Sequence, residues 1–479
     1  MIPDVRRRAW LFVLGSLSCL PAVQAGAEGL NLRLAPALSV PLTMPAPAAG
    51  PAARATSWSD LLEAASSQAA VNRAADAGFE AAQAQSEGLW ASAWMPRLDA
   101  SAAANRQQQS YNGVEVRTPA SSMTLTATLP LWRAADRAAA RAQAATAEQA
   151  EWQARTSRAA VAREVSRAYL GAVETAEQVR LTQAQQAVLA ELVQINERRL
   201  QGGLGTVLDI LETRIRLDQT RASIQDLLTR LGTQRLTLER LTGRPVVLPS
   251  GLASVGIALP QVVPPRDQAV ALVNERNPQL HEAHAQVQAA QAITEARSGE
   301  SWQPTVDGVA QAGRSRQVQQ FEGATDKQNI STRSVGVQVN WPLYTGGYHR
   351  QREKEATALL VQAEARRDDT RTQVDTSLSD AYQTLAQLNQ VIAVQREVEQ
   401  SALATTEALR KAFSAGLRSN LDLLNAQQQV HAARQSLVTA RVGALNAQVD
   451  ILALINQLDA PSTAPLMAVV DTTAWSQVP

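Results

Sequence analysis

Two segments of the chain alternate apolar with polar residues. Residues 123–129 alternate Met, Leu, Ala and Leu with threonines, and residues 334–341 alternate Val, Val, Val and Trp with Ser, Gln and Asn. A period of two predicts β-strands with one apolar face. More weakly alternating partners begin at Arg97 and Thr305. The pattern therefore predicts two β-hairpins.

The two hairpins are predicted at about residues 97–131 and 304–343. Within each, a polar segment separates the two strands: QQQSYNGVEV, residues 107–116, and QQFEGATDKQN, residues 319–329. We expect both segments to be loops, because they lack a consistent apolar face.

Helical periodicity surrounds each hairpin. Amphipathic helices are predicted before the hairpins, at about 58–94 and 266–301. After the hairpins, residues 132–201 and 348–415 contain no Pro. At about 1.5 Å per residue, each of these helices would reach roughly 100 Å. In the second, apolar residues recur in steps of four and three, beginning at Val374, which predicts coiled-coil packing.

Glycines end both long helices. Gly202-Gly203 and Gly416 break the pattern, and helical periodicity resumes at about 204–241 and 417–458. The chain is therefore predicted to form two antiparallel helical hairpins, with tips at about residues 201–209 and 414–422.

The two halves of the chain repeat one plan. SRAYLGAV recurs as SDAYQTLA, and GGLGTVLDILE recurs as AGLRSNLDLLN, both 213 residues later. WMPRLDA likewise matches WQPTVDG, and TLPLW matches NWPLY. The repeats predict two structural units, 58–245 and 266–458, joined by a linker at 246–265 and followed by a tail at 459–479.

The N-terminus has the pattern of a secretory signal. Arg6, Arg7 and Arg8 precede an apolar run that ends at Leu20, and small residues surround a cleavage site after Ala25. Residues 1–25 are therefore predicted to be a signal peptide, followed by a flexible Pro/Ala-rich leader at 26–57.

The sequence contains one cysteine, Cys19, and it lies inside the predicted signal. Cleavage after Ala25 leaves a mature chain without thiol chemistry. A lipid anchor at Cys19 is an alternative, since SLSC distantly resembles a lipoprotein cleavage site. The Leu that usually stands three residues before such a cysteine is absent.

Composition excludes several functional classes. Lys plus Arg number 45 and Asp plus Glu 44, so no net field attracts nucleic acid. Four Phe and five Tyr in 479 residues provide few large side chains for a compact globule. The pattern predicts a mainly α fold with a small β part. No apolar stretch of about 18 residues follows the signal, so any membrane crossing would use strands.

Strands cross a lipid core only as closed barrels, because an open edge leaves backbone groups unpaired in hydrocarbon. Four strands are too few, since the smallest ordinary transmembrane barrels need about eight. We therefore expect copies of the chain to pool their strands. Aromatic residues at the predicted helix-strand junctions suit a boundary between lipid and water, or alternatively the core of each junction. They are Trp90, Trp94, Trp132, Trp302, Trp341 and Tyr344.

These features together resemble the TolC family of outer-membrane efflux and secretion channels over about residues 58–458. The specific marks are the duplicated plan, PLW and PLY at the hairpin ends, TGG after the second, the repeated AY, and the Gly-Leu tips followed by LDIL and LDLL. The resemblance implies a homotrimer whose twelve strands form one barrel in the outer membrane. Its long helices would form a coiled-coil tunnel across the periplasm.

The resemblance also implies roles for residues at the helical tips. Asp422 matches an aspartate of the family's constriction ring, and Arg418 and Phe413 match an arginine and an aromatic that latch the closed aperture. Asp209 stands where the family has a latch acceptor. Asn425 departs from the pattern, because TolC has a second ring aspartate there, and this halves the expected ring charge. Alternatively, Asp209 and Asp422 are helix caps.

An adaptor protein is expected to dock at the tips, at Gly203, Leu204, Gly416 and Leu417. The implied partners are a periplasmic adaptor (membrane fusion protein), an inner-membrane ABC or RND transporter, and outer-membrane lipid. The absence of a convincing lipid-anchor cysteine favours protein export by type I secretion over small-molecule efflux with an RND pump. An exported coiled-coil scaffold or adhesin is the alternative from another class; it would have no need of strands between long helices.

Enzymatic and metal sites are not expected, and no cofactor is implied. His281 and His284 stand at i and i+3, whereas the zinc-protease motif needs the second His at the position of Ala285. The glycines of QGGLG follow no strand and so do not form a dinucleotide fingerprint. Nothing in the sequence brings a nucleophile together with its base.

Overall fold

The computed structural model describes residues 55–111, 114–252, 259–300, 303–321 and 324–474. The predicted signal peptide, nearly all of the predicted leader, and Trp302 lie outside these residues.

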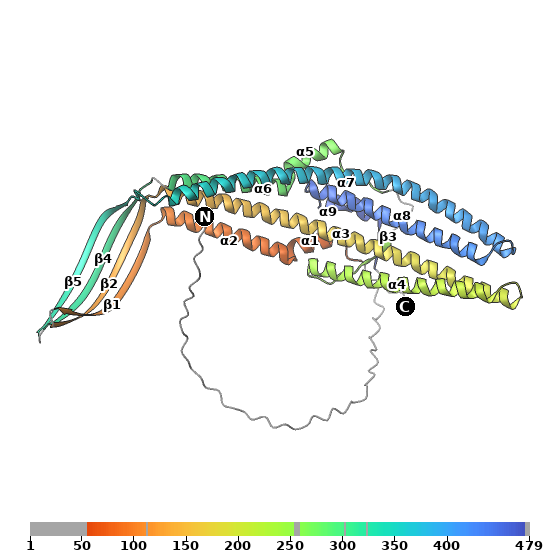
Figure 1. Cartoon of the computed structure of the whole chain (residues 1–479), viewed down its shortest axis with the longest axis horizontal. Coiled ribbons are helices and arrows are strands. Elements are labelled where there is room, and N and C mark those ends of the chain that lie inside the picture. The colour runs from red at the N-terminus through yellow and green to blue at the C-terminus, as the bar shows by residue number, and fades with distance from the viewer. Residues whose placement is uncertain (1–54, 112–113, 253–258, 301–302, 322–323, 475–479) are drawn as a thin grey trace, which may run out of the picture. The chain divides into compact units, whose positions relative to one another are not determined.

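The elements follow the duplicated order of the sequence (Figure 1). The first half contains α1 (Trp58–Gln68), α2 (Ala70–Trp94), β1 (Arg97–Tyr111), β2 (Val114–Trp132), α3 (Ala134–Gln201), α4 (Val207–Thr242) and β3 (Pro249–Leu252). The second contains α5 (Arg266–Arg276), α6 (Pro278–Glu300), β4 (Thr305–Phe321), β5 (Ala324–Asn340), α7 (Tyr348–Ser414), α8 (Asn420–Leu454), α9 (Ala460–Met467) and β6 (Val470–Ala474).

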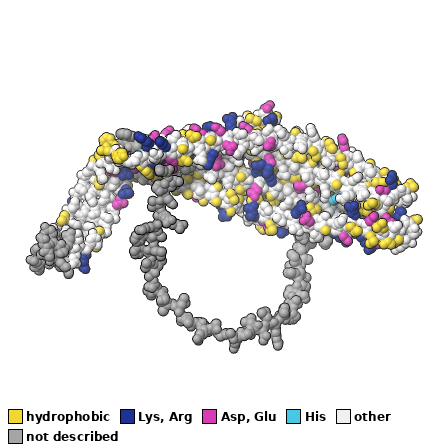
Figure 2. All heavy atoms as spheres, in the orientation of Figure 1, with side chains coloured by type: hydrophobic (Ala, Val, Ile, Leu, Met, Phe, Trp, Pro, Cys, Tyr) yellow, Lys and Arg dark blue, Asp and Glu magenta, His cyan; other side chains and the backbone are white. Residues whose placement is uncertain are grey.

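Two long helices, α3 and α7, carry the helical part. The shorter helices α2 and α4 both pack along α3, and α6 and α8 both pack along α7 (Figure 1). Helix α3 also contacts α6 and α8, so the two halves share one interface. Acidic and basic side chains are interspersed over this helical surface (Figure 2), in keeping with the balanced composition.

The heptad pattern of α7 is confirmed. Val374, Leu378 and Leu385 are buried in the main hydrophobic core, which also contains residues of α3 and α8. Trp58 anchors α1 to the same core, because its ring stacks on Tyr169 at 5.6 Å and its Nε1 donates to Ser166 Oγ at 3.0 Å. Burial raises the pKa of the Tyr169 hydroxyl well above its ordinary value.

The prediction of one continuous helix before each hairpin is wrong in both halves. The first helix is interrupted at Ala69, whose backbone is non-helical, and the second at Asn277, whose backbone is extended. Asn277 Oδ1 accepts the N–H groups of Gln279 and Leu280, and Pro278 stands at the first position of α6. Asn followed by Pro is the ordinary start of a new helix, since Pro has no N–H to lose there.

The four long strands form one antiparallel sheet in the order β1-β2-β4-β5. Strands β1 and β4 begin at Arg97 and Thr305, as predicted. The segments predicted as loops, 107–116 and 319–329, belong largely to strands, so that prediction is wrong. Backbone pairing continues from Arg97↔Thr128 to Tyr111↔Val114, and it does not need an apolar side-chain pattern. The residues between the strands, 112–113 and 322–323, lie outside the described part.

A second, two-stranded sheet joins the predicted linker to the predicted tail. Strand β3 of the linker pairs antiparallel with β6 of the tail. The fully buried Glu177 of α3 holds this sheet, because its Oε2 accepts the N–H of Leu252 at 3.1 Å and its Oε1 pairs with Arg180 at 2.8 Å. Burial and Arg396 lower the pKa of the buried Arg441, and Glu177 opposes that shift.

One described helix, α8, is long and apolar enough to cross a membrane. However, 72% of its apolar window is buried inside the fold, so it serves as a core helix.

Candidate functional site

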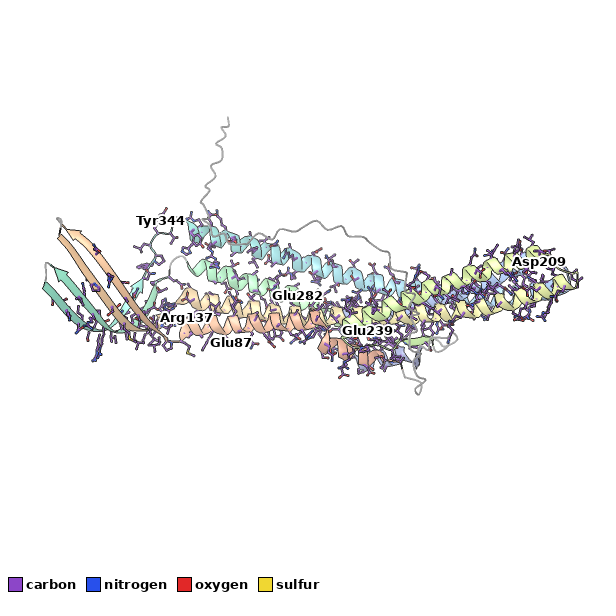
Figure 3. The ribbon with its side chains drawn as sticks, turned by 90° about the horizontal axis from the view of Figure 1, so that it is seen from below. Glu87, Arg137, Asp209, Glu239, Glu282 and Tyr344 are labelled. Carbon is purple, nitrogen blue, oxygen red and sulfur yellow. The ribbon has the colours of Figure 1, made fainter. Side chains whose placement is uncertain are left out.

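The hairpin tips and the four-stranded sheet lie at opposite ends of the long helices. Figure 3 shows Asp209 at one end, and Tyr344 and Arg137 at the other. The sites predicted from sequence fall at these two ends.

Both tips use the same backbone turn. Gly203 (φ +72°) and Gly416 (φ +77°) adopt left-handed conformations after the last helical turn. The N–H groups of Leu204 and Leu417 then donate to carbonyls five residues earlier, at 2.8 and 2.9 Å. This is the Schellman arrangement, which favours glycine because a Cβ is disfavoured at positive φ. Two identical reversals follow from the repeated Gly-Leu sequence.

Asp209 and Asp422 close capping boxes at the starts of α4 and α8. Asp209 Oδ2 accepts the N–H of Thr206 at 2.9 Å, and Thr206 Oγ1 accepts the N–H of Asp209 at 3.2 Å. Ser419 and Asp422 exchange the equivalent bonds at 3.3 and 3.2 Å. Each carboxylate thus satisfies an otherwise unpaired helix N-terminal donor. Both aspartates are half-buried, and Arg418 and Asn425 are exposed.

Phe413 is buried where the two helical hairpins meet. Its ring lies under the Arg199 guanidinium, 4.4 Å from the ring centroid, and its carbonyl accepts from Arg199 Nη1 at 3.0 Å. It belongs to a small core that contains residues of α3, α4, α7 and α8: Leu189, Leu192, Leu217, Phe413, Leu423 and Leu424. Arg199 of the first hairpin thus holds the end of α7.

A buried polar cluster near the tips was missed in the sequence. Asn196 Nδ2 donates to Asn420 Oδ1 and to Thr213 Oγ1, both at 3.0 Å. Asn420 Nδ2 donates to the Asp209 carbonyl at 3.2 Å. The cluster connects α3, α4 and α8, and its three buried side chains hydrogen-bond to one another. Its only sequence signal is polar residues at core positions of the heptads.

Exposed apolar side chains surround the tips (Figure 2). Leu204 and Leu417 at the two turns are 75% and 78% exposed. The first helical turns beyond them add further exposed side chains: Val207, Leu208, Leu211, Ile215 and Leu421. An exposed apolar group of this size is typical of a protein-binding surface.

The sheet has one apolar face, which contains residues of all four strands. Register aligns Leu98 with Ala127, Ala127 with Ala310, and Ala310 with Val335. We call this the apolar face; it comprises Leu98, Ala100, Ala102, Met123, Leu125, Ala127, Leu129, Val306, Gly308, Ala310, Ala312, Val335, Val337 and Val339. Threonines of β2, with Gln311, Ser334 and Gln338, lie on the other, polar face.

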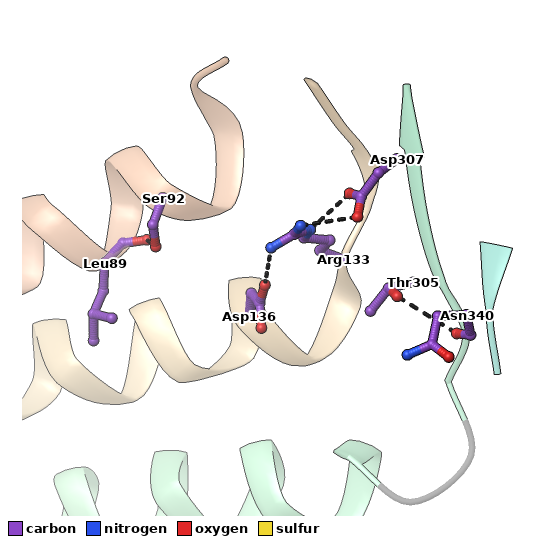
Figure 4. Close-up of polar contacts among 7 residues, drawn as sticks. All are labelled: Leu89, Ser92, Arg133, Asp136, Thr305, Asp307 and Asn340. Atoms are coloured by element: carbon purple, nitrogen blue, oxygen red, sulfur yellow. Dashed lines mark hydrogen bonds and ion pairs between the residues drawn. The ribbon is translucent and has the colours of Figure 1, made fainter. Parts of the chain in front are cut away.

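The described aromatic residues of the junctions are exposed. Trp132, Trp341 and Tyr344 are 52%, 56% and 89% exposed, close to where the strands meet the helices. Arg133 fixes this junction, because its Nε and Nη2 bind the two carboxylate oxygens of Asp307 at 2.7 and 2.9 Å (Figure 4). Its Nη1 also binds Asp136 at 3.1 Å. The start of α3 is thereby tied to β4 of the second half.

Of the two histidines singled out in the sequence, His284 is exposed and His281 has ordinary structural contacts. His281 stacks on Trp152 with centroids 4.4 Å apart, and its Nε2 lies 2.8 Å from the Glu275 carbonyl. Among the described residues, no group of three or more His, Cys, Asp or Glu side chains could hold a metal ion.

Comparison with known proteins agrees with this geometry. A family model described as "Outer membrane efflux protein" matches residues 61–244 and 269–457, most of both halves. The chain belongs to this family. It is therefore an outer-membrane protein that extends into the periplasm, in a family of channel proteins rather than enzymes.

The family's named members include proteins for secretion and for efflux. The chain is 30% identical to the alkaline protease secretion protein AprF of Pseudomonas aeruginosa, over 59% of this chain and 58% of AprF. It is 27% identical to the outer membrane efflux protein BepC of Brucella suis, over 57% and 58%. It is 25% identical to TolC of Escherichia coli, over 62% and 64%. The chain thus spans about three fifths of the length of each.

Solved channel structures share the fold over most of the chain. The outer membrane protein VceC of Vibrio cholerae aligns with a TM-score of 0.69 at 18% identity, covering 83% of this chain and 95% of VceC. The outer-membrane channel CmeC of Campylobacter jejuni aligns with a TM-score of 0.71 at 16% identity, covering 84% and 85%.

Proposed function

We propose that three copies of this chain form one outer-membrane conduit for a tripartite export system. Their sheets would close into a twelve-stranded barrel, and their helices would continue it as a periplasmic tunnel. A periplasmic adaptor and an inner-membrane pump would deliver the substrate. The apolar face carries this proposal, because four strands with large aliphatic side chains exposed to water would be unfavourable outside lipid.

The open edges of the sheet support the trimer. Strands β1 and β5 lie at the ends of the order β1-β2-β4-β5, so within the described chain each pairs along one side only. Unpaired strand edges are not tolerated in hydrocarbon. Pairing β1 of one copy with β5 of the next satisfies both edges and brings the number of strands above the minimum for a barrel.

Two exposed valines in a heptad stripe of α7 support the same arrangement. An overlapping second heptad stripe of α7 consists of Val391, Val394, Val398 and Ala402. Its residues Val394 and Val398 are 56% and 44% exposed in the single chain. The first stripe, with Leu378 and Leu385, is already buried in the core. A neighbouring copy packed on the second stripe would complete a tubular coiled coil.

The cargo is proposed to be protein, by type I secretion with an ABC pump. Two relatives support this: AprF, and the proteases secretion protein PrtF of Dickeya chrysanthemi, at 27% identity over 57% of this chain and 59% of PrtF. The second candidate, small-molecule efflux with an RND pump, is favoured by the likeness to BepC.

Deletion of the gene separates the two cargo classes. We expect a large secreted protein to disappear from the medium of the deletion strain while its drug tolerance is unchanged. Secreted proteins would be profiled beside growth inhibition by a panel of drugs. Normal secretion with increased drug sensitivity would reject protein export and support small-molecule efflux.

We propose that the exposed leucines of the tips bind the adaptor. Replacing Leu204 and Leu417 together by Ser should lower export at least tenfold, because an apolar contact is lost at each tip. The melting temperature should stay unchanged, since both side chains are exposed. The control is Leu236→Ser, which is 60% exposed on α4 away from the turns. Equal export by the double variant and the control would reject the docking role.

Asp422 is proposed to belong to a ring of three carboxylates at the aperture, with Asp209, Arg418 and Phe413 stabilising its closed form. Three such charges around a narrow axis would attract cations. We expect Asp422→Ala, and equally Asp422→Asn, to change single-channel conductance or cation selectivity in planar bilayers. The Asn variant keeps an oxygen for the Ser419 N–H, so it isolates charge from capping. If Asp422→Asn left conductance and cation selectivity unchanged, like the control Asp218→Asn, the ring role would be rejected and Asp422 would be only a helix cap.

A further inference from the structure

Basic side chains of the outer strand segments gather on one face of the sheet, beyond the apolar residues. Arg314 and Arg316 follow Ala310 and Ala312 along β4 at spacings of two, so they share the apolar face. Strands β1 and β5 continue the same face with further basic residues. We call this group the basic band: Arg106, Arg314, Arg316, Lys327 and Arg333. All five side chains are exposed.

The basic band begins where the apolar residues end. Arg333 stands directly opposite Ala312 in the register, and Arg314 stands opposite Met123. In the next row outward, Arg316 stands opposite Ser121 and Asn329. Between the band's first rows, a shallow groove is lined by Arg314 and Arg316 and by the small polar residues Ser121, Asn329 and Ser331.

The other face of the same strand segments is almost uncharged. Within residues 103–107, 118–122, 313–317 and 326–332, the described side chains on that face are Ala, Gly, Ile, Asn, Gln, Ser and Thr, and the single charged one is Asp326. If the outer strand segments were merely solvated, basic residues would be expected on both faces. Their restriction to one face indicates that this face meets a different environment.

The charge of the basic band is not neutralised within the described chain. None of the five side chains forms an ion pair with a described carboxylate. Arg117 and Glu115 fall on the same face by register, but their side chains lie outside the described set. Like charges in neighbouring positions of a sheet repel one another, so this arrangement is favourable only when anions lie among them.

We propose that the basic band binds phosphate groups of the phosphorylated glycolipid in the outer leaflet. This inference rests on the proposed function, which turns the apolar face toward lipid. The helices then lie on the periplasmic side, so the strand ends that carry the basic band reach the outer leaflet. The guanidinium groups of Arg314, Arg316 and Arg333 would bind phosphate oxygens in pairs, as arginine forks do. Three copies would place the band around the whole barrel.

Two features favour outer-leaflet glycolipid over other anionic ligands of the basic band. An anionic cargo would pass along the polar face, which carries none of the band's residues. Inner-leaflet phospholipid would meet the junction end of the strands, where Trp132, Trp341 and Tyr344 lie. The basic band directly adjoins the apolar face. A phosphorylated lipid matches this arrangement, because its acyl chains would contact the apolar face while its phosphate groups contact the basic band.

The test measures binding of purified lipopolysaccharide to the detergent-solubilised full chain. The variant combines Arg314→Gln, Arg316→Gln and Arg333→Gln; the matched control combines Arg221→Gln, Arg230→Gln and Arg235→Gln on α4. Native mass spectrometry would count bound glycolipid, and a titration would give the dissociation constant. We expect the strand variant to bind at least tenfold more weakly than the wild type, and the control to bind equally.

A second arm needs no variant. Wild-type protein should bind dephosphorylated lipopolysaccharide at least tenfold more weakly than the phosphorylated form. Equal binding of the two lipids, or equal binding by the strand variant and the control, would overturn this inference. The wild type's oligomeric state and insertion into vesicles, measured on the same preparation, test the proposed function separately. A trimer that inserts into vesicles but binds phosphorylated and dephosphorylated lipopolysaccharide equally would refute only the lipid site.

Discussion

Replacing Val337 by Arg should prevent assembly of the protein in the outer membrane, whereas Gln338→Arg should be tolerated. Val337 lies on the apolar face of β5 and is 66% exposed in the single chain. Gln338, its neighbour, lies on the polar face beside Asp307. An arginine facing lipid near the midplane costs about 2–4 kcal/mol per copy, and in the proposed trimer three copies would share one barrel. An arginine on the polar face would meet water inside the proposed barrel.

The measurement is the amount of heat-resistant oligomer in outer-membrane fractions. We expect at least a tenfold loss for Val337→Arg and less than a twofold change for Gln338→Arg. The pair Leu125→Arg and Thr126→Arg on β2 should repeat the contrast. Equal amounts of oligomer for both members of each pair would mean that the apolar face does not meet lipid.

Gly251→Ala should detach the small sheet β3–β6 from α3. Gly251 has φ +137°, a conformation that residues with a side chain rarely adopt, and an added Cβ would lie 2.5 Å from Glu177 Oε2. Glu177 is fully buried and accepts the N–H of Leu252, so it has little room to move. Backbone strain and this overlap should together cost roughly 1–3 kcal/mol.

Protease sensitivity of the chain around residues 246–265 should rise with this substitution, while the long helices stay resistant. Gly232→Ala is the matched control, because an added Cβ there meets nothing within 4 Å and the residue lies inside α4. It should be neutral or stabilising. The same protease resistance in both variants would show that Glu177 does not hold the small sheet.

Much of the fold could be predicted because its determinants are local and repeated. Period two located the strand faces around Leu125 and Val337, and heptads located the buried stripe around Leu378. Gly203 and Gly416 marked both reversals, since each turn needs a residue with positive φ. Each signal depends on a few neighbouring residues, and the second half of the chain repeats it.

The remaining features depend on contacts between distant segments. The pairing of β3 with β6 joins residues about 220 positions apart, and neither strand has a distinctive pattern. The polar cluster around Asn196 and Asn420 is recognisable only once α3 and α8 are adjacent. The basic band likewise requires the cross-strand register, because Arg106 and Arg333 are unrelated in sequence. In contrast, the break at Asn277-Pro278 has a local signal, because Asn followed by Pro is typical of a helix start.

Cross-linking of β1 to β5 tests the shared barrel most directly. The sequence has one cysteine, Cys19, so engineered pairs would be the only thiols after signal cleavage. One cysteine would replace Ala100 or Ala102 and another Val335, Val337 or Val339, in all six combinations. Within one chain β2 and β4 separate these strands, by roughly 14 Å at the usual spacing, which is too far for a disulfide. We predict that a cysteine pair in register yields a covalent trimer on oxidation. The shared barrel would be contradicted if every pair gave only monomers and the protein stayed in solution without detergent.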